Sequence, residues 1–337
     1  MIDKKPVNFS TVGYILGIQN KCLYSWYRKY LSGYPEALSS GEWGKDDFVS
    51  YHSREPSKSR VPVLKPDNFG AEMSIDEKML DEEFFTVMTN RQTGKIALLA
   101  QTMRVDELMK LIEKVPQIQH LPKNITCDLS PTYEKFCNMV FPEATQIADK
   151  FHVIRAALES LQAVRIRLKQ SYLASLPKDK KERKAAEEKS RLINNETPAE
   201  MLSRSRYLLF KRPEEWTMGQ QKRADILFEN YPEIRKAYYN ILLFRKLLDK
   251  ENIKKVHDMS KRWYEWFWKV EQDNVNEIVA FAALVERNEE KIKAYLWTGK
   301  TNAAAENMNS KLQRFITANY GTRDTDFFLF RIAKYFS

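Results

Sequence analysis

The chain has 337 residues, of which 43% are hydrophobic and 12% aromatic, so it can form two or three domains and is not wholly disordered. Lys and Arg number 55 against 45 Asp and Glu, and the resulting charge of +10 favours a polyanionic partner only modestly. Three scattered cysteines form no CxxC pair, which excludes a zinc ligand set and a disulfide framework. Without a secretory leader or an apolar run of about 18 residues, the sequence predicts a cytoplasmic protein with no membrane partner.

The first 35 residues predict a small helical segment. Residues 9–31 show two short helices separated at Gly17, and Lys21, Arg28 and Lys29 belong to the second of them. This pattern suits a helix-turn-helix whose second helix enters a DNA major groove, and it suits a plain helical hairpin equally well. Gly, Pro, Ser and charged residues dominate residues 36–70, which we expect to form a linker.

Residues 71–155 predict alternating strands and helices. The expected strands are residues 73–75, ending at Asp76, and then 84–88, 95–99, 125–127 and 146–148. Helical spacing covers residues 105–115, a second helix begins at Ser130 and Pro131, and a third follows Asp149. Three consecutive strands followed by alternating helices and strands describe a mixed α/β sheet.

Residues 156–296 carry almost no strand pattern and predict an all-helical block. Its densest aromatic cluster, residues 262–268, is typical of a buried helix seam. The alternative is an aromatic side chain that stacks on unpaired bases. Within residues 297–337 the helical pattern returns, and Met308, Leu312 and Phe315 form an apolar stripe with Glu306 on the opposite side.

Three acidic residues in different contexts are the candidate catalytic and metal-binding residues: Asp76, Asp128 and Glu306. In an RNase H-like sheet the first and fourth predicted strands are neighbours, which brings Asp76 and Asp128 together. With Glu306 from the last helix, the three carboxylates suit two Mg²⁺ or Mn²⁺ ions about 3.5–4 Å apart. Sites of this kind cleave and join phosphodiester bonds.

Further residues are expected around this site or on DNA. Asp149, at the end of the fifth predicted strand, and His152, one helical turn later, are predicted to lie near the site, although a cap or a packed polar group at the strand–helix junction would explain His152 as well. Asn309 projects from the same side of its helix as Glu306. The candidate DNA contacts are Lys21, Arg28, Lys29, Arg155, Arg165, Arg167, Lys169 and Lys311.

Four stretches resemble the catalytic core of the ISL-three family of DDE transposases. They are residues 75–77 (Ile-Asp-Glu), 127–133, 141–153 (which contains Asp-Lys-Phe-His-Val) and 302–312, and the resemblance covers roughly residues 71–337. It implies an RNase H-like fold divided into residues 71–155 and 297–337, with residues 156–296 as an all-helical insertion. The family's chemistry would be metal-dependent cleavage at the inverted-repeat ends of an insertion sequence, followed by transfer of the 3′-hydroxyl into target DNA.

The same resemblance implies a bacterial, nucleoid-associated protein that forms a dimer on DNA. Two departures from the family pattern are visible. A cysteine-rich zinc-binding module is lacking, so recognition of the element ends would rest on residues 9–31 or on a partner chain. Ala303 and Asn307 stand where the family commonly has glycine. The alternatives are an inactive DNA-binding relic and an RNase H-like junction nuclease.

Overall fold

The computed structural model describes residues 63–80, 83–252, 256–300, 303–318, 331–332 and 335–336. The chain divides into two compact units, one of Met1–Gln146 with Asn302–Ser337 and the other of Ile147–Thr301. The predicted helix-turn-helix-like segment, with Lys21, Arg28 and Lys29, lies outside the described residues, as does most of the predicted linker. None of the described helices is long and apolar enough to cross a lipid bilayer.

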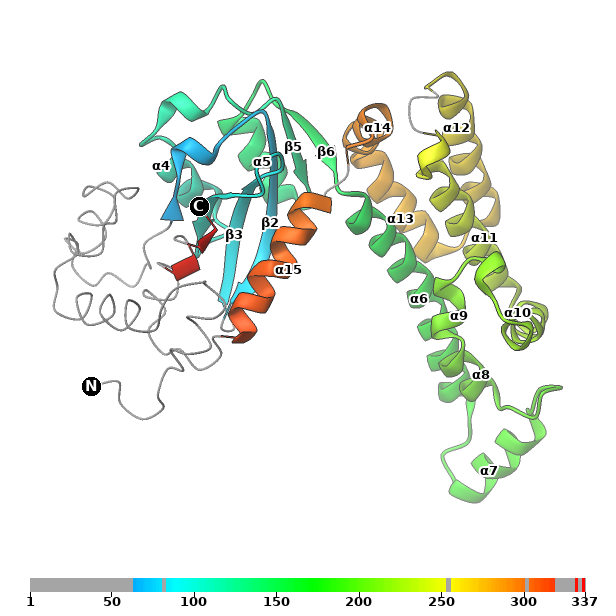
Figure 1. Cartoon of the computed structure of the whole chain (residues 1–337). Helices are drawn as coiled ribbons and strands as arrows, with labels where there is room; N and C mark the ends of the chain where they lie inside the picture. Colours follow the sequence, from blue (N-terminus) through cyan, green and yellow to red (C-terminus); the bar gives the residue numbers. More distant parts are fainter. Residues whose placement is uncertain are drawn as a thin grey trace, which may run out of the picture. The chain divides into compact units, whose positions relative to one another are not determined.

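The first unit contains a six-stranded mixed sheet with the strand order β1-β4-β3-β2-β5-β6 (Figure 1). The strands are β1 (Val63–Leu64), β2 (Glu72–Leu80), β3 (Glu83–Asn90), β4 (Ile96–Ala100), β5 (Asn124–Cys127) and β6 (Thr145–Ala148). Strands β2, β3 and β4 are antiparallel neighbours, and β5 runs parallel to β2. The predicted adjacency of the first and fourth long strands is confirmed, and with it the RNase H-like α/β fold.

Two details of this sheet differ from the sequence prediction. Strand β2 continues for four residues beyond Asp76, so this residue lies inside a strand rather than at its end. The extension exists because residues 76–80 pair with residues 83–87 of β3 in an antiparallel ladder. In addition, β1 and a short 3₁₀ turn (η2, Pro66–Asn68) lie within the range expected to be linker, where Val63 pairs with Leu99 of β4.

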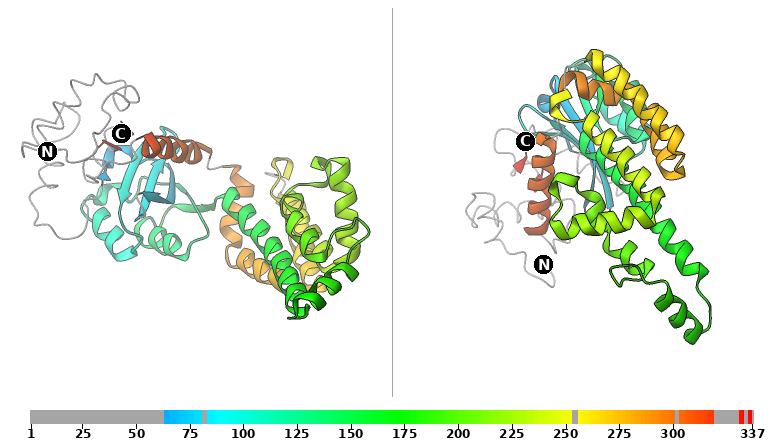
Figure 2. Two further views of the ribbon diagram at one scale, coloured as in Figure 1. Left: turned by 90° about the horizontal axis from the view of Figure 1, so that it is seen from below. Right: turned by 90° about the vertical axis from the view of Figure 1, so that its right-hand side faces the viewer.

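Helices cover both faces of the sheet. Helices α4 (Val105–Ile112) and α5 (Pro131–Val140) and the 3₁₀ turn η3 (Pro116–Ile118) bury one face against residues such as Met73, Ile75 and Met88. Helix α15 (Ala303–Ala318) lies along the other face in each view (Figures 1 and 2). Its Met308, Leu312 and Phe315 share a core with Phe85, Val87, Ile96 and Leu99. The predicted apolar stripe of the last helix is therefore the stripe that packs on the sheet.

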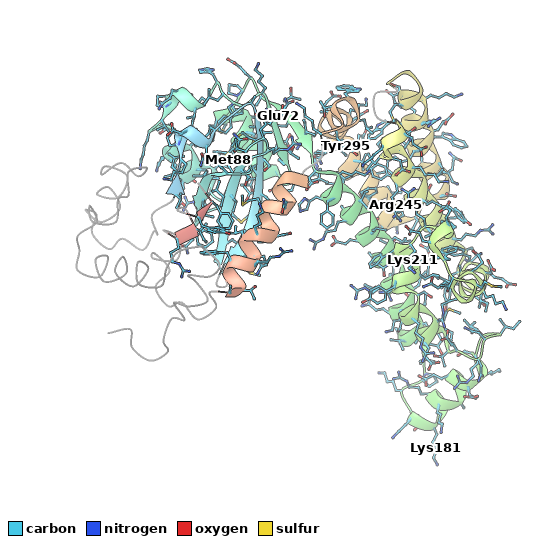
Figure 3. The ribbon with its side chains drawn as sticks, in the orientation of Figure 1. Glu72, Met88, Lys181, Lys211, Arg245 and Tyr295 are labelled. Atoms are coloured by element: carbon cyan, nitrogen blue, oxygen red, sulfur yellow. The ribbon has the colours of Figure 1, made fainter. Side chains whose placement is uncertain are left out.

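Apart from the last two residues of β6, the regular secondary structure of the described residues in the second unit is helical. Its helices are α6 (Lys150–Ser175), α7 (Lys180–Lys189), α8 (Pro198–Arg204), α9 (Arg206–Phe210), α10 (Met218–Asn230), α11 (Pro232–Leu247), α12 (Val256–Asp273), α13 (Asn276–Arg287) and α14 (Glu289–Thr298), with 3₁₀ turns η4 (Pro213–Glu215) and η5 (Lys250–Asn252). Long helix α6 packs against α8, α11 and α13. Helix α7 buries none of its residues, and Lys181 projects from it away from the other helices (Figure 3).

The aromatic cluster on α12 forms the core of this helical unit. Trp263 and Trp266 are 1% and 2% exposed, and the ring of Trp266 lies 4.7 Å from that of Phe244 on α11. The indole N–H of Trp266 donates to the carbonyl oxygen of Asn240 over 3.0 Å, which satisfies its only polar atom. Tyr264 and Trp268 are 67% and 63% exposed. The buried-seam interpretation is therefore correct for Trp263 and Trp266.

Two of the predicted DNA contacts are used inside this unit instead. Arg165 is 7% exposed, and it donates to Gln162 Oε1 at 2.6 Å and to the Leu202 carbonyl oxygen at 3.0 Å. Arg167 bridges helices by pairing with Glu233 and, at 2.6 Å, with Glu277. Arg165 is buried, whereas the Arg167 side chain is 40% exposed and is engaged by two carboxylates. The basic pattern of the sequence alone does not reveal these partners. We therefore do not place Arg165 and Arg167 among the proposed DNA contacts.

The Arg167–Glu277 pair predicts acid sensitivity of the helical unit. Its hydrogen bond lowers the pKa of Glu277 below the usual value of 4.5. Since the folded-state pKa is the lower one, the pair stabilises the folded state above pH of about 4.5 and loses this effect as pH falls through the folded-state pKa. We expect the urea midpoint of unfolding to fall between about pH 5 and 3 in the wild type, and to fall less in Glu277→Gln. Parallel pH profiles of the two proteins would contradict this assignment.

Candidate active site

The strand register places Asp76 and Asp128 beside each other. Glu72, Met73 and Ser74 of β2 pair with Asn124, Ile125 and Thr126 of parallel strand β5. Two residues further along the same register, Asp76 stands next to Asp128, which directly follows the end of β5. The carboxyl ends of parallel strands are the edge of a sheet at which α/β proteins place their ligands.

Backbone hydrogen bonds hold both carboxylates. Asp76 Oδ1 accepts from the backbone N–H of Glu77 at 2.8 Å, and Asp128 Oδ1 accepts from the backbone N–H of Ser130 at 2.9 Å. The second bond closes a turn immediately before α5, which begins at Pro131 as predicted. Both side chains are half-buried.

Strand alternation assigns Asp76 to the α15 face of the sheet. Met73 and Ile75 point into the core beneath α4 and α5, so Asp76 points to the opposite face. Its cross-strand partner is Val87, whose side chain belongs to the core under α15. Helix α15 contacts both β2 and β3.

The position of Glu306 in the chain fits this arrangement. It lies in the first turn of α15, and α15 belongs to the same unit as Asp76 and Asp128. The side chains of Glu306 and Asn309 lie outside the described part of the structure, so a direct contact with the two aspartates stays a prediction. Within the described ranges, no group of three or more Asp, Glu, His or Cys side chains is placed to hold a metal.

A fourth acid, Glu77, lies close to the aspartate pair and was not singled out from the sequence. Burial, the negative charge of Asp128 and that of Asp76 raise the pKa of Glu77 above its usual value. This response of one carboxyl group to both aspartates indicates that negative charge accumulates at this place. Such an accumulation is stabilised by a cation.

Tyr133 is a second residue that the sequence analysis missed. It is fully buried on α5, and its hydroxyl lies 3.2 Å from Thr86 Oγ1, which itself donates to the Thr102 carbonyl oxygen at 2.6 Å. Because the only hydroxyl proton of Thr86 is used in that bond, Tyr133 is the donor to Thr86. Burial, Glu77, Asp128 and Asp76 raise the pKa of Tyr133, so it stays protonated. The sequence feature that could have pointed to Tyr133 is its position in the first turn of α5, shortly after Asp128.

Asp149 and His152 form a capping arrangement at the start of α6. Asp149 is 3% exposed, accepts from the backbone N–H of Phe151 at 3.0 Å, and lies 2.9 Å from His152 Nδ1. Asp149 directly follows β6, the strand next to β5 in the sheet order. Capping accounts for these contacts, and the proximity of both residues to the active site stays a prediction.

Removal of the Asp149 cap is expected to destabilise the protein. Asp149→Ala loses the acceptor of the Phe151 N–H and should lower the free energy of unfolding by about 1 kcal/mol. Asp149→Asn keeps a capping oxygen and should change it by less than about 0.5 kcal/mol. Urea unfolding of both variants tests this. Equal losses in the two variants would mean that the charge toward His152, and not the cap, carries the stabilisation.

The other candidate DNA contacts lie at different depths. Arg155 is exposed on α6 and pairs with Glu159 at 2.8 Å, whereas Lys169 is half-buried on the same helix. Lys311 is exposed on α15.

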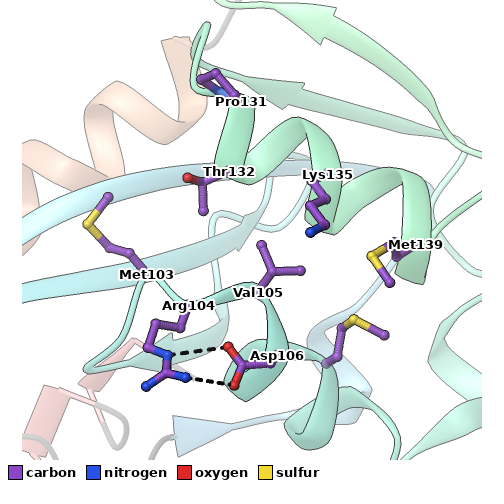
Figure 4. A pocket seen from close by; sticks show the side chains of 9 residues that line it. Met103, Arg104, Val105, Asp106, Pro131, Thr132, Lys135 and Met139 are labelled. Atoms are coloured by element: carbon purple, nitrogen blue, oxygen red, sulfur yellow. Dashed lines mark hydrogen bonds and ion pairs between the residues drawn. The ribbon is translucent and has the colours of Figure 1, made fainter.

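One hollow of the first unit lies apart from the aspartates. It has a volume of about 620 Å³ and lies between α4 and α5 (Figure 4). Its lining residues are Met103, Arg104, Val105, Asp106, Met109, Pro131, Thr132, Lys135 and Met139. Arg104 and Asp106 pair across 3.1 Å at its rim. Since this hollow does not contain Asp76 or Asp128, the candidate active site is defined by these two carboxylates and by the register of β2 and β5.

An RNase H-like sheet in which Asp76 on β2 neighbours Asp128, directly after the parallel strand β5, is the arrangement expected of the catalytic core of a DDE enzyme. A family model described as "Transposase", that of the ISL-three DDE family, matches residues 73–332. The chain belongs to the ISL-three family of DDE transposases.

Individual proteins show weaker similarity. The "Transposase for insertion sequence element IS1557" of two Mycobacterium tuberculosis strains, CDC 1551 / Oshkosh and H37Rv, is 24% identical over 220 residues. The match covers 63% of this chain and 46% of the relative, so the chain spans about half the length of these curated relatives.

Two solved structures also match. The catalytic core domain of BIV integrase matches with 13% identity and a TM-score of 0.20, over 42% of this chain and 99% of that one. The Drosophila P element transposase strand transfer complex matches with 10% identity and a TM-score of 0.30, over 95% of this chain and 94% of that one.

Proposed function

We propose that this protein is a DNA transposase that cleaves a strand at the ends of an insertion sequence and joins the freed 3′-hydroxyl to target DNA. The observation that carries the proposal is the register of β2 and β5, which sets Asp76 beside Asp128 in a chain of the ISL-three family. The name of the Mycobacterium tuberculosis relatives, a transposase for an insertion sequence element, supports the substrate class.

The donor set fits hard divalent cations. Asp76 and Asp128 each accept a backbone hydrogen bond, and burial together with the charges of Asp128 and Asp76 raises the pKa of the neighbouring Glu77. Together with Glu306 they would hold two Mg²⁺ or Mn²⁺ ions. When bound, such ions supply a nucleophile at neutral pH and stabilise the charge on the leaving oxygen.

The residues of the chain contribute positioning and charge. The backbone N–H of Ser130 fixes the orientation of Asp128, and the bond from Tyr133 to Thr86 ties α5 to β3 beneath it. The Glu72 carboxylate accepts from Asn124 Nδ2 at 2.9 Å, which pins β2 to β5 at the start of their pairing. Reactions that transfer phosphoryl groups depend on such positioning because the active-site geometry must form before the bond breaks.

DNA would be the partner, with the element ends and the target bound in turn. Arg155, Lys169 and Lys311 remain the described candidates for phosphate contacts. Two ends must be held together for transposition, so we propose a dimer on DNA, with end recognition by residues 9–31 or by a partner chain.

The test is a cleavage and joining assay with the inverted repeats that flank the reading frame. The full chain should nick labelled repeat ends in the presence of Mg²⁺ or Mn²⁺ and join them to a plasmid, and it should do neither in EDTA. Cutting of branched DNA without joining would indicate a junction nuclease. Binding of the repeats without metal-dependent cleavage would indicate an inactive relic.

A further inference from the structure

A second pocket lies on α15, next to the sheet and distinct from the carboxylates. It has a volume of about 570 Å³, within the range of about 300–1,000 Å³ that is usual for ligand sites. The residues that line it are Gly94, Lys95, Met308, Lys311, Arg314, Phe315, Ala318, Tyr335 and Phe336. All belong to the first unit. We call this hollow the α15 pocket.

The charge of the α15 pocket is of one sign. Lys95, Lys311 and Arg314 are exposed at its rim, and none of the nine lining residues is acidic. Among the described residues, none of these three cations makes an ion pair with a carboxylate. Three cations that no described carboxylate neutralises form a site for an anion that is larger than one oxygen.

Three aromatic residues and a methionine are among the lining residues of the α15 pocket. Met308, Phe315 and Phe336 are buried, while Tyr335 is 44% exposed. The Tyr335 ring stacks on Phe315 with centroids 5.5 Å apart and planes at 27°, and the Arg331 guanidinium lies 5.3 Å from the Phe315 ring. Tyr335 is thus held in place with part of its surface open to the pocket, so that little rotamer freedom is lost when a planar group binds.

Cations beside an exposed, fixed aromatic ring match the chemistry of an unpaired nucleotide. The phosphates of a nucleic acid strand bind Lys and Arg, and an unpaired base can stack on an aromatic side chain. A base inside a duplex is already stacked on both sides, and its faces are not accessible to a pocket. The same helix carries Glu306, and Arg314 lies about 12 Å from it along the helix axis, at 1.5 Å per residue.

We propose that the α15 pocket binds an unpaired nucleotide of the DNA strand engaged at the acidic site. Lys311 and Arg314 bind its phosphates, and Tyr335 stacks on its base. The proposal rests on the proposed function, because it takes DNA to be the substrate. It adds that the enzyme binds a frayed or single-stranded end in preference to a closed duplex.

The experiment measures fluorescence anisotropy of labelled DNA with the full-length chain in EDTA, where no cleavage occurs. The probes are a blunt duplex and the same duplex with a 3′ single-stranded overhang. Tyr335→Ala should weaken overhang binding by roughly tenfold, as expected for the loss of one base–aromatic stack, and leave blunt-duplex binding within about twofold. Tyr335→Phe keeps the ring and should bind like the wild type.

The phosphate contacts are tested by the double variant Lys311→Gln/Arg314→Gln. It should reduce the slope of log affinity against log salt by about 1.4 on the overhang probe, which corresponds to two lost contacts to a single strand. The matched control is Lys110→Gln/Lys114→Gln, which removes the same charge at exposed positions near the end of α4. The control should leave the slope unchanged.

Three outcomes would overturn the proposal. In the first, the Tyr335→Ala and double variants bind the overhang probe as tightly as the wild type. In the second, they bind the blunt and overhang probes equally more weakly. In the third, the Lys110→Gln/Lys114→Gln control changes the salt slope as much as the double variant does. Because all arms are read without metal, failure of the wild type to cleave DNA would overturn the proposed function alone. Loss of affinity confined to the overhang probe would support the pocket whether or not cleavage is seen.

Discussion

Asp128→Asn is expected to abolish metal-dependent strand cleavage, with a loss on the order of a thousandfold, equivalent to about 4 kcal/mol of transition-state stabilisation. The amide keeps an oxygen that can accept from the Ser130 N–H, so the turn before α5 should survive. The substitution removes the negative charge that a divalent cation requires. The measurement is the single-turnover rate of nicking on labelled inverted-repeat DNA in Mn²⁺, next to DNA retention on a native gel.

Retention and thermal unfolding of the Asp128→Asn protein should match the wild type, because only one charge at the edge of the sheet changes. Asp106→Asn is the matched control, because Asp106 is exposed on α4 and pairs with Arg104. The Asp106→Asn protein should cleave DNA at the wild-type rate. Cleavage by Asp128→Asn within tenfold of the wild type would contradict the assignment of Asp128. If Asp128→Asn loses both cleavage and its folded structure, the Asp76→Asn variant tests the active-site assignment instead.

Trp266→Ala is expected to destabilise the helical unit by about 3–5 kcal/mol, since it leaves a cavity between α11, α12 and α13. Trp266 is 2% exposed, and its ring contacts Phe244 and Phe281. The matched control lies two residues away on the same helix, because Trp268 is 63% exposed. Trp268→Ala should change the free energy of unfolding by less than about 0.5 kcal/mol.

Urea unfolding followed by circular dichroism separates these two variants, with the midpoint of the transition that involves the helical unit as the readout. Equal destabilisation by both substitutions would show that the outer face of α12 is covered in the folded protein. A stable Trp268→Ala protein that binds unpaired DNA more weakly would instead assign the base-stacking role to the exposed side of α12.

The order of the elements was predictable from the sequence because it depends on local patterns. The alternating apolar residues around Ile75, the continuous apolar run around Leu98, the turn at Gly94 and the Ser130–Pro131 helix start each depend on neighbouring residues alone. The adjacency of Asp76 and Asp128 was predictable once an RNase H-like strand order was assumed in addition to these local patterns. The extension of β2 past Asp76 was not predictable in this way, since it depends on pairing with β3.

Side-chain partners that are far apart in the sequence limited how much of the candidate site could be predicted. Arg165 and Arg167 have the sequence pattern of a basic helix face, and only the packing of α6 shows that Leu202, Glu233 and Glu277 engage them. Tyr133 likewise looks like an ordinary core residue of α5. Its bond to Thr86 crosses 47 residues of sequence, and no local pattern predicts it.

The central claim is that Asp76 and Asp128 form one cation site. An anomalous-scattering map from crystals soaked in Mn²⁺ tests this claim most directly. The structure predicts a peak between the two carboxylates, on the face of the sheet that α15 covers. A map in which both aspartates are ordered and no peak lies between them would contradict the proposed active site.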